Sequence, residues 1–182
     1  MTTDHSPHAD WIRSAVQRYE GPLIRYAAQI VGDLERARDV VQDTFIRLCA
    51  DEQSLVETHL AEWLFTVCRH RALDIQRKES RMQPINEEEM RTYASQEPTP
   101  AMAAEHRETA RQVLRLLEML PPNQQEVIRL KFQNELSYQE ISNVTRLTVT
   151  NVGFLIHTAI KTIRQQLRAQ SALIPQPVRR TQ

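Results

Sequence analysis

Small polar side chains at the start of one C-terminal helix have the types and spacing needed to read DNA bases. The candidate readers are Thr148, Thr150, Asn151 and His157. An asparagine amide can make two hydrogen bonds to adenine, and a threonine can offer a hydroxyl to a base edge or a methyl to thymine. Thr148 has an alternative role, because a hydroxyl at that place can also cap the helix. These residues predict a surface that contacts base edges.

Three cations accompany the candidate readers. They are Arg146, Lys161 and Arg164. Such side chains hold backbone phosphates, which position a protein without reading sequence. The charge distribution agrees: residues 106–182 contain 11 Lys or Arg and 5 Asp or Glu, against 10 and 12 in residues 1–78 and 2 and 6 in residues 79–105. A basic end on a chain of zero net charge is typical of a unit that binds phosphates.

The elements that must position these residues form a helix-turn-helix. Pro121 and Pro122 mark the start of a first helix, and Ser137 lies three residues before Glu140, the spacing of a reciprocal capping box. The second helix is expected from Tyr138 to about Thr145, and the next two residues form the turn. The apolar face of the closing helix is Val152, Ile156, Ala159 and Ile163. A helix in this position can enter a DNA major groove.

The pattern of the N-terminal part predicts three or four helices. Apolar residues recur at helical spacing over residues 9–30, from Asp33 to about residue 48, and over residues 59–79. Asp33 is expected to cap the second helix, and residues 50–58 form a polar loop before the third. Cys49 and Cys68 fall in apolar stripes, so both are interpreted as core thiols.

The fold class predicted is all-α, with two small helical domains joined by a flexible linker. The N-terminal domain is residues 1–80, the linker 81–104, the C-terminal domain with the helix-turn-helix 105–170, and the tail 171–182. The linker region contains three prolines and the acidic triplet Glu87–Glu89, and it lacks a sustained period. The helix that opens the second domain is expected to direct five residues inward. They are Ala110, Val113, Leu114, Leu117 and Leu120.

Composition argues against several classes of protein. Three glycines in 182 residues do not suit an all-β fold or a glycine-rich phosphate loop. The sequence has no metal-ligand spacing of His and Cys and no nucleophile-elbow motif, so we expect no enzyme activity, no metal and no cofactor. No apolar run approaches the roughly 18 residues of a membrane-spanning helix, and the first residues do not resemble a secretion signal. We therefore expect a cytoplasmic protein without membrane insertion.

Three segments in order resemble a known family. DLERARDVVQDTFIRL is similar to the polymerase-binding segment of bacterial extracytoplasmic-function (ECF) sigma factors, within the sigma-70-like family. HLAEWLFTVCRHRALDIQRKESR resembles that family's promoter-melting and downstream-box segment, and LPPNQQEVIRLKF with the following helix-turn-helix resembles its upstream-box reader. The resemblance implies a factor that binds core RNA polymerase and promoter DNA, and it allows an anti-sigma protein as a further partner.

The resemblance also implies roles for two sets of residues. The polymerase-binding set is Asp39, Gln42, Asp43 and Arg47. The downstream-box set is Arg69, His70, Arg71, Arg77, Lys78 and Arg81. The pattern alone allows a plainer interpretation, in which both sets are solvated helix faces. The same resemblance places capture of a flipped promoter base at the loop 50–58, whereas Trp63 and Phe45 are interpreted as core residues.

The reading helix departs from the family pattern. The family usually has Lys at the position of Gly153, often Arg at Leu155 and Thr158, and commonly Gly at the turn position of Arg146. The helix is therefore unusually apolar, and Phe154, Leu155 and Ile160 lie outside its expected core stripe. A rival hypothesis is a stand-alone helix-turn-helix regulator whose N-terminal bundle senses a signal or dimerises.

Overall fold

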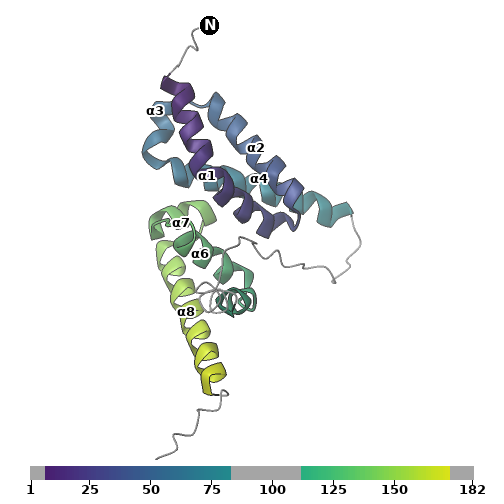
Figure 1. Cartoon of the computed structure of the whole chain (residues 1–182), viewed down its shortest axis with the longest axis vertical. Coiled ribbons are helices and arrows are strands. Elements are labelled where there is room, and N and C mark those ends of the chain that lie inside the picture. The colour runs from purple at the N-terminus through teal and green to yellow at the C-terminus, as the bar shows by residue number, and fades with distance from the viewer. Residues whose placement is uncertain (1–6, 83–111, 173–182) are drawn as a thin grey trace, which may run out of the picture.

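The computed structural model describes residues 7–82 and 112–172, and it shows two helical units packed against each other (Figure 1). Every regular element in these ranges is helical, which confirms the predicted fold class. None of these helices is long and apolar enough to cross a bilayer. Most of the proposed linker and most of the proposed tail lie outside the described residues, so the domain boundaries stay predictions.

Three long helices and two short helical turns build the N-terminal unit. They are α1 (Pro7–Val31), α2 (Leu34–Ala50), α3 (Gln53–Val56), the 3₁₀ turn η1 (Glu57–His59) and α4 (Leu60–Met82). Asp33 caps α2 as predicted, since its Oδ1 accepts a hydrogen bond from the Arg36 amide at 2.8 Å. The expected polar loop 50–58 is wrong in part, because it contains α3 and the start of η1. Val56 is buried and anchors this segment on the core.

The core of this unit lies where α1, α2 and α4 meet. Leu23, Leu48 and Leu64 are fully buried there. Cys68 is buried as predicted, and burial raises the pKa of its thiol to about 12. The prediction of a core thiol at Cys49 is wrong, because Cys49 is exposed. Cys49 directly follows the inward Leu48 on α2, and each residue of a helix is rotated by about 100° from the residue before it. This rotation turns the Cys49 side chain to the surface.

Local caps define the C-terminal helix-turn-helix. It consists of a helical segment at 112–118 and then α6 (Pro122–Phe132), α7 (Tyr138–Thr145) and α8 (Val149–Ala172). The predicted capping box is present: the Glu140 amide donates to Ser137 Oγ at 3.2 Å, and the Ser137 amide donates to Glu140 Oε2 at 2.6 Å. Arg146 makes the turn with φ +60°. This left-handed conformation explains why glycine suits the position in the family.

Two expectations about apolar positions in this unit are corrected. Val113 is exposed, and Leu116 is buried in its place next to Leu117 and Leu120. Leu155 is buried in the core, although the sequence pattern predicts it outside the apolar stripe of α8. The second correction follows from the packing of α8 on α6 and α7, which buries a wider face than a narrow stripe implies.

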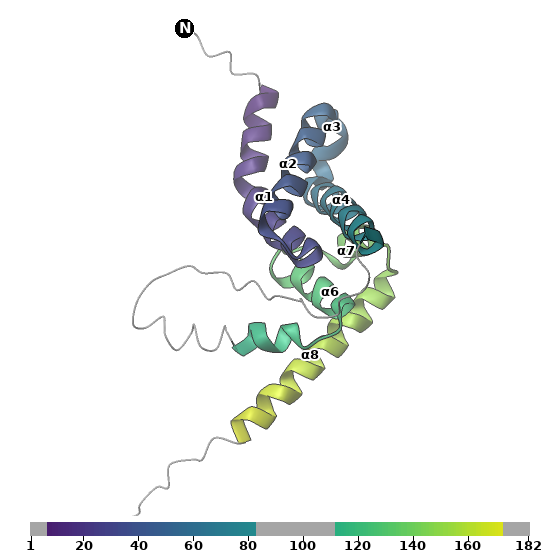
Figure 2. The same cartoon turned by 90° about the vertical axis from the view of Figure 1, so that its right-hand side faces the viewer.

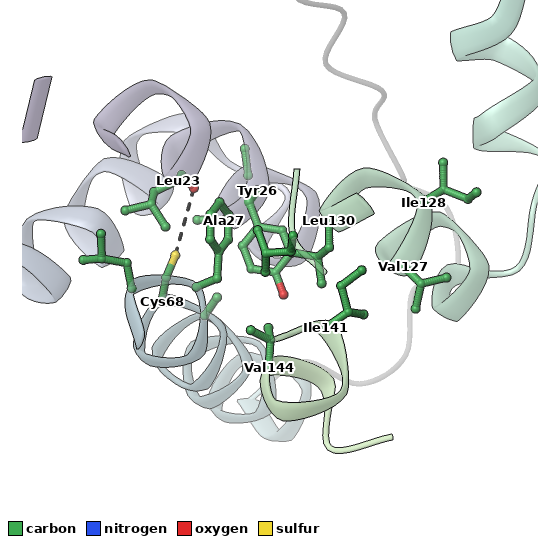
Figure 3. Packing of buried hydrophobic residues seen from close by; sticks show 14 of the residues in the cluster. Leu23, Tyr26, Ala27, Cys68, Val127, Ile128, Leu130, Ile141 and Val144 are labelled. Carbon is green, nitrogen blue, oxygen red and sulfur yellow. Dashed lines mark hydrogen bonds between the residues drawn. The ribbon is translucent and has the colours of Figure 1, made fainter. Parts of the chain in front are cut away.

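The two units share an apolar contact (Figure 2). Helix α7 packs on α4, and α6 lies beneath α1 and α4 in this view. Figure 3 shows Tyr26 and Ala27 of α1 on one side of the contact, facing Leu130 of α6 and Ile141 and Val144 of α7. All five side chains are buried and belong to one continuous cluster.

Candidate nucleic-acid interface

The predicted reading face of α8 is open to solvent. Thr150, Asn151 and His157 are exposed, and so are the cations Lys161 and Arg164. The buried residues of the helix, such as Val152 and Ala159, lie on the opposite side. With 3.6 residues per turn, the five exposed residues share one broad face about four turns long. The structure therefore brings most of the predicted upstream-box residues together.

Phe154 lies in the middle of this face. It follows Thr150 by about one turn and precedes His157 by about one turn. Its side chain is 65% exposed, which is unusual for a large apolar residue on a folded helix. The sequence shows it as an apolar departure from the family pattern and indicates no role for it. Gly153 beside it is half-buried, and an added Cβ there would meet the Tyr138 ring at an ordinary 3.6 Å.

The turn before α8 carries the two remaining upstream-box residues. The Asn151 amide donates to Thr148 Oγ1 at 3.2 Å, so Thr148 caps the helix. The hydroxyl is still exposed and retains its own proton. Arg146 is exposed as well, and its positive charge helps to lower the pKa of His70 on α4. This turn thus lies between the reading face and the other unit.

The predicted polymerase-binding residues share the surface of α2. Asp39, Gln42, Asp43 and Arg47 are all exposed. A groove of about 440 Å³ lies beside them, between α1 and α2, and is lined by Val41, Phe45, Ile46 and Cys49 among others. Ile46 is 60% exposed, and Phe45 is only partly buried against the core. The face therefore combines charged groups with an accessible apolar strip.

An ion pair links this face to the predicted downstream-box helix. Arg71 Nε donates to Asp43 Oδ2 at 2.8 Å, and both side chains are nearly half exposed. Further along α4, Arg77 pairs with Asp74 at 3.4 Å, and Lys78 is exposed. The side chain of Arg81 lies outside the described residues. Exposed pairs of this kind contribute little stability, so Arg71 and Arg77 remain able to exchange partners.

Two residues of the downstream-box set, His70 and Arg69, are partly covered. His70 is half-buried, and its pKa is lowered, first by burial and then by the charges of Arg146 and Arg69.

Trp63 is partly buried and packs against the core, consistent with its interpretation as a core residue. Phe65, which sequence analysis did not single out, is buried and meets the Tyr26 ring edge-on at 5.3 Å between centroids.

Arg69 is bound to the C-terminal unit rather than exposed. Its Nε donates to Glu126 Oε1 at 2.8 Å and its Nη2 to Glu126 Oε2 at 3.3 Å. The Tyr26 hydroxyl donates to the same Oε1 at 2.7 Å. Burial lowers the pKa of Arg69, but the Glu126 carboxylate more than offsets this and the net direction is upward. A second polar contact joins the units, because the side-chain amide of Asn143 on α7 donates to Glu62 Oε1 on α4 at 3.0 Å.

Sequence reasoning missed Glu126 and its two donors as a group. Glu126 lies 57 residues from Arg69 and 100 residues from Tyr26 in the chain. No periodicity or spacing connects residues at such separations. The only sequence signal was the opposite charge of the two units, which indicates attraction without naming partners.

Comparison with known proteins identifies the family. The family described as Sigma-70 region 2 matches residues 15–82, and Sigma-70 region 4 matches residues 110–163. The ECF RNA polymerase sigma factors SigM and SigW of Bacillus subtilis (strain 168) are each 26% identical, over 154 and 168 residues. The aligned parts cover 84% and 87% of this chain and 90% of either relative.

Solved structures share the fold. The sigma factor RpoE in complex with the anti-sigma factor NepR from Bartonella quintana superposes with a TM-score of 0.62 at 20% identity, covering 87% of this chain and 98% of that one. CnrH in complex with the cytosolic domain of CnrY gives a TM-score of 0.58 at 23% identity, covering 88% and 90%. The chain belongs to the sigma-70 family of RNA polymerase sigma factors, in the ECF group.

Proposed function

We propose that the chain binds core RNA polymerase through α2 and directs it to promoters through two separate DNA surfaces, one on α8 and one on α4. Membership of the sigma-70 family makes promoter-specific initiation its function. The observation that carries the residue assignment is the exposed face of α8, where polar, cationic and aromatic side chains lie together away from the core.

Helix α8 recognises the upstream promoter box as duplex DNA in this proposal. Asn151 and Thr150 contact base edges in the major groove. Lys161 and Arg164 hold phosphates further along the helix, and Arg146 does so at the turn. All of these residues are exposed in the structure, so the surface needs no rearrangement of the C-terminal unit.

Helix α4 contacts the downstream box and stabilises its opened strand. Arg71, Arg77 and Lys78 are exposed cations on this helix, suited to the backbone of single-stranded DNA. Each of the first two exchanges an exposed carboxylate partner for a phosphate. His70 and Arg81 belong to the same proposed surface, and the segment 50–58 is the proposed place of base capture.

Polymerase binds the α2 face in this scheme. Asp39, Gln42, Asp43 and Arg47 provide charge complementarity, which sets register and association rate. The apolar groove beside them, with exposed Ile46, provides buried area for affinity. We propose that the factor performs no catalytic chemistry itself and acts in the cytoplasm, where polymerase meets promoter DNA. The structure of RpoE with the anti-sigma factor NepR supports an anti-sigma protein as a regulatory partner of this chain.

Charge reversal on α2 tests the proposal. We expect Asp39→Lys to weaken binding to core RNA polymerase roughly 100-fold, because like charges at a complementary interface cost several kcal/mol. The fold should stay intact, since Asp39 is exposed and off the buried face. Binding is measured by fluorescence anisotropy of labelled protein with purified core enzyme, and initiation by transcription in a purified reaction.

The control is Asp10→Lys, which reverses an exposed charge at the start of α1, on a different helix from the proposed face. It should bind polymerase like the wild type. Wild-type polymerase binding by Asp39→Lys would refute the assignment of α2. A chain that binds duplex DNA as a dimer and never associates with polymerase would support the stand-alone regulator instead.

A further inference from the structure

Three hydrogen-bond donors of the N-terminal unit converge on one carboxylate of the other unit. The donors are the Tyr26 hydroxyl and two nitrogens of Arg69, at 2.7, 2.8 and 3.3 Å from the Glu126 oxygens. The Arg69 and Glu126 side chains are only 18% and 22% exposed. The group is therefore an anion site that a protein carboxylate occupies.

The N-terminal unit alone builds the donor side of this site. Tyr26 is on α1 and Arg69 is on α4, two helices that pack together independently of the C-terminal unit. The edge-on Phe65 ring and the buried residues around it hold the Tyr26 ring in place. Figure 3 shows the Tyr26 oxygen directed toward the helices of the other unit. The donors should thus keep their arrangement when Glu126 leaves.

The chemistry of the donors suits a phosphate as well as a carboxylate. A guanidinium presents two parallel N–H groups that match two oxygens of either anion. Burial and the nearby Glu126 raise the pKa of Tyr26 well above its usual value, so the hydroxyl keeps its proton and donates. Arg77 follows Arg69 by eight residues on α4, which sets it about 12 Å further along the helix and about 80° further round it, so the site adjoins the proposed phosphate-binding surface of that helix.

We propose that Tyr26 and Arg69 form a binding site for a backbone phosphate of the opened promoter strand, and that Glu126 occupies it as a substitute anion while the two units are in contact. The inference rests on the proposed function, which places single-stranded DNA along α4. It adds Tyr26 to the DNA-binding residues and assigns to Glu126 the role of a competing ligand.

Occupation by Glu126 and by DNA is mutually exclusive. One set of three donors cannot serve both anions, and α7 covers the adjacent surface of α4 while Glu126 is bound. Release of Glu126 also requires the apolar contact around Val144 and the Asn143–Glu62 bond to part. Strand binding and separation of the units are therefore coupled through a single site.

The test uses the full chain and a fluorescein-labelled 12-nucleotide single-stranded DNA of mixed sequence. Glu126→Gln removes the competing charge with little change of shape. We expect it to enlarge the radius of gyration in small-angle X-ray scattering and to raise affinity for the oligonucleotide about tenfold, because the competent state becomes the major one. Glu118→Gln is the matched control, since it removes an exposed carboxylate from the same unit as Glu126, whereas the Tyr26 and Arg69 donors bind Glu126. It should change neither quantity.

The second arm measures the site itself in the Glu126→Gln background. Adding Tyr26→Phe should weaken oligonucleotide binding about tenfold, as expected for a lost hydrogen bond to a charged group. Adding Arg69→Gln should lower the salt slope of binding by about 0.7, the value for one phosphate on a single strand. Tyr19→Phe, a partly buried tyrosine on the same helix, is the control and should have no effect. Circular dichroism checks that each variant is folded.

Two outcomes would overturn the inference. If Glu126→Gln changed neither the radius of gyration nor the affinity for the oligonucleotide, Glu126 would not compete for the site. Undiminished binding by the Tyr26→Phe double variant would show that no phosphate uses these donors. If both arms succeed while Asp39→Lys still binds polymerase normally, the phosphate site stands and the polymerase-binding assignment fails.

Discussion

Helices α4 and α8 both carry cations proposed to hold DNA, but the structure presents them differently. On α8, Lys161 and Arg164 are exposed on a face that no described part of the other unit covers. On α4, Arg69 is bound to Glu126 and Arg71 to Asp43. The difference teaches that one surface is ready for duplex DNA, whereas the other must first lose protein carboxylates from its cations.

The contrast has a physical origin in charge and shape. Residues 1–78 contain more acidic than basic residues, and residues 106–182 contain an excess of Lys and Arg. Opposite net charge draws the units together, and the apolar patches of α4 and α7 then bury each other. Helix α4 is a basic helix in the acidic unit, and carboxylates of both units lie beside it. Glu126 therefore pairs with Arg69, and Asp43 pairs with Arg71.

The largest effect expected from this contrast concerns salt. Arg164→Ala should weaken binding of the full chain to duplex DNA roughly tenfold at low salt for every sequence, and lower the salt slope by about 0.9. Arg69→Gln should leave the duplex salt slope unchanged, because that guanidinium is already neutralised by Glu126. Both slopes come from anisotropy titrations at several salt concentrations. Equal slopes for the two variants would remove the distinction between an open and an occupied surface.

A smaller effect should report the apolar centre of the α8 face. If Phe154 packs on a thymine methyl in the upstream box, replacing that thymine by uracil should cost the wild type about fourfold in affinity, the value of one buried methyl-sized group. Phe154→Ala should lose this sensitivity. The positions are found by uracil substitution along a duplex selected from a random pool by the wild-type protein.

Phe132→Ala is the matched control for this measurement. Phe132 is 59% exposed in the same unit, but it lies on α6, away from the reading face. Its variant should keep the uracil penalty of the wild type. A penalty that persists in Phe154→Ala would mean that another residue of the face contacts the methyl.

The smallest effect should appear on acidification, through His70. Its pKa in the folded protein is lowered by burial and by the positive charges of Arg146 and Arg69, against a smaller opposing effect of Asp74. Below the ordinary His pKa of about 6.5, the unfolded chain binds the proton first, so stability falls as pH falls through that value. His70→Gln should remove this part of the pH dependence, by less than about 1 kcal/mol because the ring is partly solvated. Urea unfolding between pH 7.5 and 5.5 measures it.

How much of the site followed from sequence depended on the range of the interactions involved. The exposed residues of α8 were placed correctly, because amphipathic periodicity assigns the outward face of a helix from its neighbours alone. The exposure of Asp39 and Asp43 on α2 was predictable for the same reason. The occupied state of Arg69 was not predictable, since it depends on where another unit docks.

By itself the sequence determined the long helices and the caps at which three helices begin. Asp33, Thr148 and the pair Ser137–Glu140 cap helices through hydrogen bonds spanning three residues, so local chemistry was sufficient. The tertiary structure alone decided that Glu126 joins Tyr26 and Arg69. Burial and long-range ion pairs arise only when whole helices pack, because their partners lie tens of residues apart and no local pattern records which surfaces will meet.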